Sequence, residues 1–181
     1  MPGLPKWQLS HIGLFVSDMD RMREFYTRLL GFTVMDAGDL KNGRRLTFLS
    51  KDPKDHHQIV LVTGREKGAR STVNQITFRV ASIKEVRAMH DLAVANKVDA
   101  VDPVDHGNAW SVYFMDPEGN RIEFFCDTPW YTAQPHRVAL DFSLSDKEIE
   151  EATHLRIAGD PTTRPFAEWR DQKRRELDLA N

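Results

Sequence analysis

The sequence contains only one cysteine, Cys126, among its 181 residues. A single thiol excludes an intramolecular disulfide, and because Cys126 stands inside an apolar run we expect a buried side chain rather than a nucleophile. An excess of positive charge is also missing: 25 basic residues face 27 acidic ones, and the formal net charge is -2. Because a phosphate backbone is bound through a positive field, we expect no nucleic-acid partner.

Long apolar runs are absent as well. No stretch approaches the roughly 20 residues that a membrane-spanning helix requires. The first residues, Met-Pro-Gly-Leu-Pro-Lys-Trp, lack the basic and then apolar pattern of a secretory signal. We therefore expect a cytosolic protein with no membrane partner. Its composition, with 40% hydrophobic and 29% charged residues, is typical of a globular chain.

The sequence does contain an internal repeat. A shift of 64 positions, from 11 to 75, aligns HIGLFV with QITFRV, and both segments alternate as strands do. A helical pattern follows each segment, with Ser17 or Asp18 as the first cap and a Ser82/Glu85 capping box at the second. Three short apolar segments follow each helix, at 32–37, 45–50 and 58–63 and at 98–104, 110–115 and 120–126. Each half is therefore predicted to be βαβββ.

This pattern predicts an α+β fold in which two βαβββ modules, about 7–64 and 72–127, form a curved mixed sheet around a metal cavity. The paired domain spans residues 1–130, and residues 131–181 form a C-terminal helical extension. Helices are expected from 145 to about 157 and from 166 to 179. We interpret this extension as a packing or dimer arm in preference to a lid, because helical appendages usually bury one apolar face. A homodimer is expected.

Three side chains at related strand positions are candidate metal ligands. His11 shares a strand face with Gly13, a residue that often marks close approach of a ligand. Glu123 is a lone carboxylate among apolar residues, which is costly unless it is paired or bound to metal. Its structural alternative is an ion pair, for which the candidates are Arg44, Arg45 and Arg79. Gln75 aligns with His11 in the repeat, and Val60 with Glu123.

Three further residues are candidates for catalytic roles. His56 and His57 open a predicted strand, and because strand neighbours point to opposite faces, one of them is expected to face the cavity as an acid or base. His106 and Tyr113 precede the turn before Glu123, and both can donate a hydrogen bond to a bound oxygen. The structural alternatives are a loop histidine and a half-buried strand tyrosine.

Residues 7–130 resemble the vicinal oxygen chelate superfamily, which includes glyoxalases, bleomycin-resistance proteins and extradiol dioxygenases. The segments that carry the resemblance are LSHIGLFV (9–16), FYTRLLGF (25–32) and YFMDPEGNRIE (113–123). Within the superfamily the chain looks most like a one-domain extradiol ring-cleaving dioxygenase. That resemblance implies a proton-donor role for His57, and contacts to substrate or oxygen for His106 and Tyr113. It departs at Gln75, where extradiol enzymes place a second histidine.

The first hypothesis for function is therefore a metal-dependent extradiol-type dioxygenase that cleaves a small catecholic aromatic with O2. One nitrogen and two oxygen donors are acceptable to several divalent metals, of which Fe(II) is expected first, with Mn(II), Zn(II) or Ni(II) as alternatives. Gln75 favours a second hypothesis, a glyoxalase-like lyase or isomerase, because glutamine is a ligand in some glyoxalase relatives. A third is a non-catalytic ligand-binding protein of the bleomycin-resistance kind, which needs no metal.

Overall fold

The computed structural model describes residues 8–180, with side chains through residue 177. The expected start of the first module at about residue 7, the first seven residues and residue 181 lie outside this range. The chain forms two compact units. We call residues 8–74 with 116–120 the N-terminal unit, and residues 75–115 with 121–180 the C-terminal unit.

The N-terminal unit contains the first predicted module. Its elements are β1 (Ile12–Val16), α1 (Met19–Glu24), a π-helical turn η1 (Phe25–Leu29), β2 (Thr33–Asp39), β3 (Arg45–Ser50) and β4 (Ile59–Thr63). The sheet order is β1-β4-β3-β2, with β1 parallel to β4 and the other pairs antiparallel. Asp18 caps α1, because its carboxylate accepts from the Arg21 amide at 3.0 Å. The helical segment ends at Gly31, whose φ of 70° suits a residue without Cβ.

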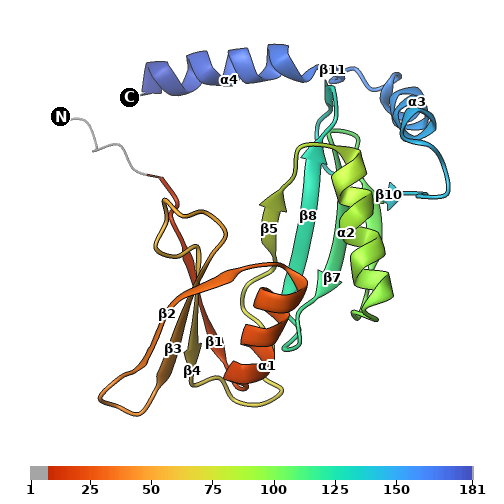
Figure 1. The fold of residues 1–181 in the computed structure, drawn as a ribbon. Coiled ribbons are helices and arrows are strands. Elements are labelled where there is room, and N and C mark those ends of the chain that lie inside the picture. Colours follow the sequence, from red (N-terminus) through yellow and green to blue (C-terminus); the bar gives the residue numbers. More distant parts are fainter. Residues whose placement is uncertain (1–7, 181) are drawn as a thin grey trace. The chain divides into compact units, whose positions relative to one another are not determined.

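The C-terminal unit repeats this arrangement. Its first elements are β5 (Ile76–Arg79), α2 (Ile83–Ala95), β6 (Asp102–Asp105), β7 (Ala109–Met115) and β8 (Arg121–Asp127). In the sheet order β10-β6-β7-β8-β5, where β10 is Val138–Ala139, β5 is parallel to β8 just as β1 is to β4. Gly13 pairs with Val60, and Thr77 pairs with Glu123, so equivalent strand positions are related by a shift of 64 residues in β1 and β5 and of 63 residues in β4 and β8. The predicted α+β fold with repeated βαβββ order is confirmed (Figure 1).

Two local predictions in the second module are wrong. β6 begins at Asp102 rather than at residue 98, because Lys97 and Ala100 have φ values of 53° and 55°, which no strand accommodates. The capping box is not formed either. Ser82 is the N-cap of α2 without a side-chain hydrogen bond, and the Glu85 carboxylate instead accepts from the Ala81 amide at 2.5 Å.

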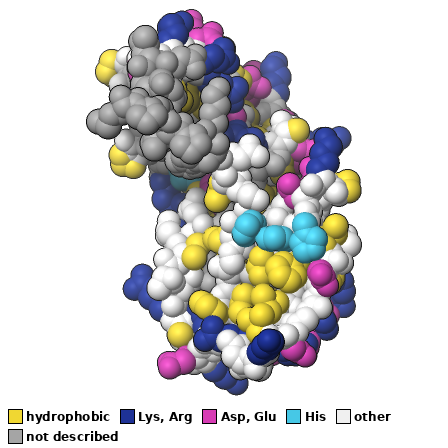
Figure 2. All heavy atoms as spheres, turned by 90° about the vertical axis from the view of Figure 1, so that its left-hand side faces the viewer, with side chains coloured by type: hydrophobic (Ala, Val, Ile, Leu, Met, Phe, Trp, Pro, Cys, Tyr) yellow, Lys and Arg dark blue, Asp and Glu magenta, His cyan; other side chains and the backbone are white. Residues whose placement is uncertain are grey.

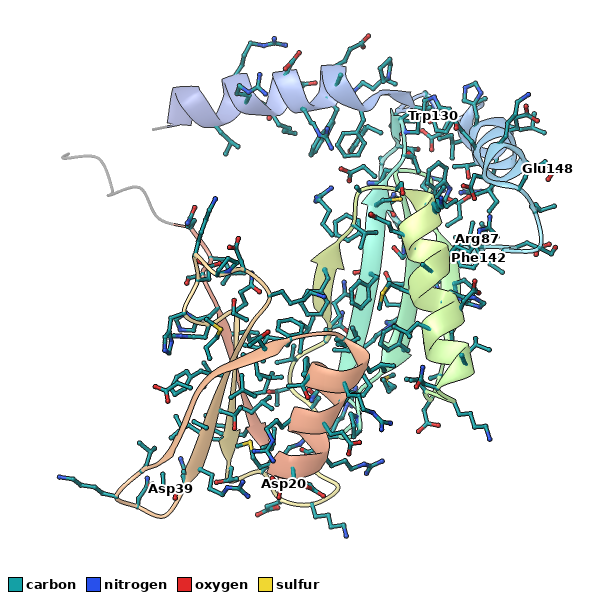
Figure 3. The ribbon with its side chains drawn as sticks, in the orientation of Figure 1. Asp20, Asp39, Arg87, Trp130, Phe142 and Glu148 are labelled. Carbon is teal, nitrogen blue, oxygen red and sulfur yellow. The ribbon has the colours of Figure 1, made fainter. Side chains whose placement is uncertain are left out.

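Helices and a short ribbon follow the second module. They are β9 (Trp130–Tyr131), β10 (Val138–Ala139), α3 (Asp146–Ile157), β11 (Arg164–Pro165) and α4 (Phe166–Ala180). Both helices agree closely with the predicted ranges, and Ser145 with Glu148 forms a capping box at α3. Arg87 of α2 donates to the carbonyl oxygens of Phe142 and Leu144 and pairs with Asp146 at 2.7 Å, so it holds the chain that leads into α3 (Figure 3).

Each sheet buries one apolar face in its own unit. In the C-terminal unit α2 packs across β7 and β8, where Val112, Phe114 and Ile122 are at most 1% exposed (Figure 1). Cys126 lies on the same face and is 2% exposed, as the sequence predicted. Because side chains alternate along a strand, the opposite face of this sheet carries Ser111, Tyr113 and Glu123. No helix in the described part of the chain is long and apolar enough to cross a membrane.

Candidate active site

Glu123 lies at the centre of a hydrogen-bonded cluster on β8 and is 6% exposed. Its Oε2 accepts from Gln75 Nε2 at 2.6 Å and from Thr77 Oγ1 at 2.8 Å. Its Oε1 accepts from Ser111 Oγ at 2.9 Å and from the Tyr113 hydroxyl at 2.5 Å. A carboxylate offers about four acceptor positions. Four uncharged donors therefore compensate the burial of this charge.

Three arginines were candidates for an ion pair with Glu123, and two of them pair with other carboxylates instead. Arg45 pairs with Asp20 at 3.2 Å, and Arg79 pairs with Asp127. Arg44 lies with its guanidinium over the ring of Phe15, at 5.3 Å from the centroid. The donors around Glu123 are instead the neutral side chains of four residues, none of them an arginine.

Strand periodicity explains which donors reach Glu123. Tyr113 on β7 and Thr77 on β5 are its direct neighbours in the ladder. Gln75 lies two residues before Thr77, and Ser111 two residues before Tyr113, so all four point to one face. The sequence prediction missed Thr77 and Ser111, although the period of two from Gln75 and Tyr113 indicates both.

His106 extends the cluster by one further hydrogen bond. Its Nε2 lies 2.9 Å from the Tyr113 hydroxyl, and its Nδ1 lies 2.7 Å from the carbonyl oxygen of His136. Because a carbonyl oxygen only accepts, Nδ1 carries a proton, and Nε2 is the ring atom that faces Tyr113. The single hydroxyl proton of Tyr113 is donated to Glu123 Oε1, and His106 Nε2 lies within reach of the same hydroxyl as an alternative acceptor for it.

The Tyr113 hydroxyl is held in its protonated form. Burial raises the pKa of Tyr113 well above its usual value of 10.0, and the hydrogen bond and negative charge of Glu123 raise it further. Arg121 opposes this effect weakly, with its guanidinium 4.0 Å from the centre of the tyrosine ring. Tyr113 therefore acts as a hydrogen-bond donor and not as a base in the neutral pH range.

His11 and His57 lie together in the N-terminal unit, with ring centroids 4.2 Å apart. His11 directly precedes β1 and is exposed, with Nδ1 3.3 Å from Ser10 Oγ. The prediction that His56 and His57 point to opposite faces is wrong. Both precede β4, outside the strand, and their Nδ1 atoms are 2.9 Å apart. Partial burial, followed by the charges of His11 and His56, lowers the pKa of His57.

The histidine cluster borders an apolar sheet face. Phe48 of β3 contacts both His56 and His57, with centroid distances of 5.5 and 5.2 Å, and Phe15 of β1 is 55% exposed. Figure 2 shows histidine side chains beside hydrophobic ones on the surface of this unit. Imidazole rings beside aromatic rings suit a ligand that combines an apolar ring with polar oxygen atoms.

The family is shown by comparison with known proteins. Residues 8–124 match the model of the Glyoxalase/Bleomycin resistance protein/Dioxygenase superfamily. The chain belongs to this superfamily. Members of the superfamily bind divalent metals, and the fosfomycin resistance protein FosX from Listeria monocytogenes has been crystallised with Mn(II) and sulfate.

Several relatives within the superfamily are dioxygenases. The chain is 26% identical over 133 residues to biphenyl-2,3-diol 1,2-dioxygenase 2 of Rhodococcus globerulus, an alignment that covers 70% of this chain and 65% of that protein. It is 26% identical to metapyrocatechase of Pseudomonas sp. strain CF600, with 76% of this chain and 44% of that protein covered. The chain therefore spans less than two thirds of the length of these relatives.

Solved structures agree with the superfamily fold. A glyoxylase/bleomycin resistance protein/dioxygenase domain from Frankia sp. EAN1pec has a TM-score of 0.58 at 19% identity, with 68% of this chain and 99% of that chain covered. A monoclinic form of FosX from Listeria monocytogenes gives a TM-score of 0.54 at 22% identity, covering 71% of this chain and 95% of that chain. These similarities concern the fold alone.

The donor atoms of the candidate ligands fit the divalent cation that the superfamily implies. Gln75 and Glu123 converge on one point of the sheet of the C-terminal unit and offer two oxygen donors that divalent cations accept, whereas His11 belongs to the N-terminal unit. Coordination by Gln75 requires its amide to present Oε1 in place of Nε2. Among the described residues, no three His, Cys, Asp or Glu side chains form a metal-binding group.

Proposed function

We propose that this chain is the catalytic domain of a metal-dependent extradiol-type dioxygenase that cleaves a small catecholic aromatic substrate. The observation that carries the proposal is the Gln75–Glu123–Tyr113–His106 cluster, in a chain whose relatives include biphenyl-2,3-diol 1,2-dioxygenase 2 and metapyrocatechase. These relatives act on aromatic diols with O2. We propose His11, Gln75 and Glu123 as the metal ligands.

A bound divalent metal, for which Fe(II) is the first candidate, would supply Lewis-acid activation and a template for the diol and O2. The protein's own groups have separate tasks. Glu123 contributes the negative charge that attracts the cation, while its hydrogen bonds from Thr77 and Ser111 keep the carboxylate in one orientation. Tyr113 donates its hydroxyl proton to Glu123 Oε1 and keeps that proton at neutral pH.

His57 is proposed as the acid/base. Its lowered pKa keeps the imidazole neutral near pH 7, so that it can accept the proton of a ring hydroxyl and return it later. The apolar surface formed by Phe15 and Phe48 is proposed to receive the aromatic ring. His106 is proposed to exchange a hydrogen bond with substrate oxygen or with Tyr113 through Nε2, since Nδ1 is bonded to the His136 carbonyl.

The test uses protein loaded with Fe(II) without oxygen and then exposed to a panel of catechols in air. We expect a yellow ring-opened product, a stoichiometric metal content, and loss of both in Glu123→Ala. His57→Ala should keep the metal but lose turnover by about 10²-fold or more. Protein that binds no metal after reconstitution, or whose His57→Ala variant performs as well as the native chain, would contradict the proposal.

One observation favours a second function. Because four protein donors already hydrogen-bond to Glu123, its burial is compensated by the protein's own groups, as in a ligand-binding protein of the bleomycin-resistance kind that needs no metal. In that case the metal content stays near zero, whereas catechols or other planar aromatics still bind. Equilibrium dialysis with and without Fe(II) separates the two functions. Activity with Ni(II) or Zn(II) but not Fe(II) would instead indicate a glyoxalase-like reaction, which Gln75 favours.

A further inference from the structure

The turn that carries His106 is held by the C-terminal extension of its own unit. Residues 105–108 connect β6 to β7, and the His106 ring extends from this turn toward Tyr113. The backbone carbonyl of His136 accepts from His106 Nδ1 at 2.7 Å, and Gln134 Nε2 donates to the carbonyl oxygen of His106 at 2.8 Å. Both the ring and the backbone of His106 therefore contact residues 134–136, which lie between β9 and β10.

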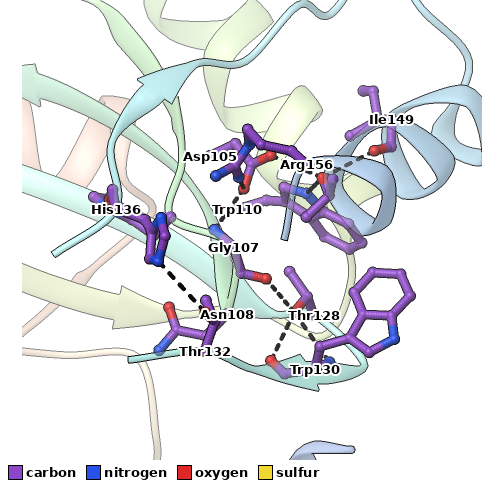
Figure 4. Close-up of polar contacts among 12 residues, drawn as sticks. Asp105, Gly107, Asn108, Trp110, Thr128, Trp130, Thr132, His136, Ile149 and Arg156 are labelled. Carbon is purple, nitrogen blue, oxygen red and sulfur yellow. Dashed lines mark hydrogen bonds and ion pairs between the residues drawn. The ribbon is translucent and has the colours of Figure 1, made fainter. Parts of the chain in front are cut away.

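Asp105 connects the same turn to α3. Its Oδ1 accepts from the Gly107 amide at 2.6 Å and pairs with Arg156 at 2.6 Å (Figure 4). Its Oδ2 accepts from Thr153 Oγ1 at 2.8 Å. The Asp105 side chain is 7% exposed and that of Arg156 is 26% exposed. A largely buried ion pair restricts the conformation of the turn, because loss of either partner leaves a buried charge.

Gly107 shows how closely the extension approaches this turn. Its φ is 79°, in the left-handed region that favours glycine. A Cβ atom at this position would lie 2.7 Å from Thr132 Cγ2 and 3.0 Å from Ile157 Cγ2. The turn is therefore packed against the extension without space for a methyl group, and Thr128 Oγ1 also donates to the Gly107 carbonyl at 2.7 Å (Figure 4).

We propose that the C-terminal extension selects the Nδ1–H tautomer of His106 and aims Nε2 at Tyr113, with Arg156 as the positioning residue. Arg156 holds Asp105, Asp105 holds the 105–108 turn through the Gly107 amide, and the turn sets the His106 ring against the His136 carbonyl. The expected effect on kcat rests on the proposed function, whereas the expected position of the His106 ring proton does not. The C-terminal extension, which lies outside the repeat, thereby orients a histidine that belongs to the second module of the repeat.

The selected tautomer has a direct consequence for proton movement. Because the His136 carbonyl occupies Nδ1, Nε2 is the only ring nitrogen through which His106 can give or take a proton. That nitrogen lies 2.9 Å from the Tyr113 hydroxyl, whose single proton is donated to Glu123 Oε1, so Nε2 is the alternative acceptor for this proton. Without the extension, the ring is free to turn or to exchange tautomers, and the Tyr113 proton loses this alternative acceptor.

The proposal is tested by Arg156→Met, which keeps much of the side-chain volume but removes the charge. Long-range ¹H–¹⁵N spectra of ¹⁵N-histidine protein, with His106 assigned through a His106→Gln variant, report which ring nitrogen is protonated. We expect Nδ1–H in the native chain and a mixture of tautomers in Arg156→Met. In ring cleavage we expect kcat to fall about tenfold or more with KM unchanged. Arg156→Lys should restore both readouts in part.

Lys147→Met is the matched control, because Lys147 lies on the same helix with a side chain that is 85% exposed. If native His106 lacks the Nδ1 proton, or if Arg156→Met keeps the native tautomer, the proposal is overturned, whatever happens to kcat. If no form of the protein cleaves catechols, the proposed function fails while the tautomer measurement still decides this inference. Should Arg156→Met not fold, Arg156→Gln carries the same comparison, because it also removes the charge, and a native tautomer in that variant would count against Arg156.

Discussion

Replacing Glu118 tests how the turn at residues 116–120 is fastened within the N-terminal unit. Glu118 Oε1 accepts from the amides of Ser17 and Asp18 at 2.7 and 2.8 Å and from Ser17 Oγ at 3.1 Å. Oε2 faces Arg65 at 3.5 Å, with side-chain exposures of 7% for Glu118 and 10% for Arg65. The carboxylate therefore binds the amides at the start of α1 and neutralises a buried arginine.

The magnitude follows from what each substitution removes. Glu118→Ala leaves two backbone amides without this acceptor and Arg65 without its partner, so we expect a loss of about 3–5 kcal/mol in the free energy of unfolding. Glu118→Gln keeps an acceptor oxygen but removes the charge, and should cost about 1.5–3 kcal/mol, the usual size of one charged hydrogen bond. The losses are not additive with that of Arg65→Met, because both changes break the same pair.

Urea unfolding followed by circular dichroism measures these losses, and amide exchange at Ser17 and Asp18 localises them. A loss of about 3–5 kcal/mol should accelerate exchange at these amides about 10²- to 10³-fold if they exchange through unfolding of this unit. Glu24→Gln is the matched control, because its ion pair with Arg28 has the same 3.5 Å separation but exposures of 62% and 79%. We expect less than about 1 kcal/mol there. Equal effects at Glu118 and Glu24 would refute the reasoning.

Three further outcomes are expected. Gly107→Ala should destabilise the chain by about 2–4 kcal/mol through its positive φ and the contacts with Thr132 and Ile157, whereas Gly159→Ala, with open space around it, should change the thermal midpoint little. Burial raises the pKa of Cys126 from 9.0 to about 12, so iodoacetamide at pH 8 should label the thiol only at the rate of unfolding; immediate labelling of native protein would contradict this. Because the folded state holds that proton more tightly, stability should fall between pH 9 and 12, and less steeply in Cys126→Ala than in the native chain.

The order of elements could be predicted from sequence because it depends on local patterns. The 64-residue shift, the helix after each strand and the position of Glu123 on an interior strand all follow from the spacing of apolar residues, and the structure bears them out. The boundaries that were wrong depend on backbone geometry. Lys97 and Ala100 adopt φ values of 53° and 55° before β6, and Ser82 leaves its predicted capping box unmade, because packing outweighs the weak preferences of single residues.

The sequence by itself thus determined the repeat, the family pattern and the residue types around the candidate site. Only the tertiary structure decided their partners. Thr77 and Ser111 join Gln75 around Glu123, His56 and His57 lie together, and Arg156 reaches Asp105 from a helix outside the repeat. The physical reason is that periodicity specifies the face on which a side chain lies. Its hydrogen-bond partners depend on strand register and on segments far away in the chain.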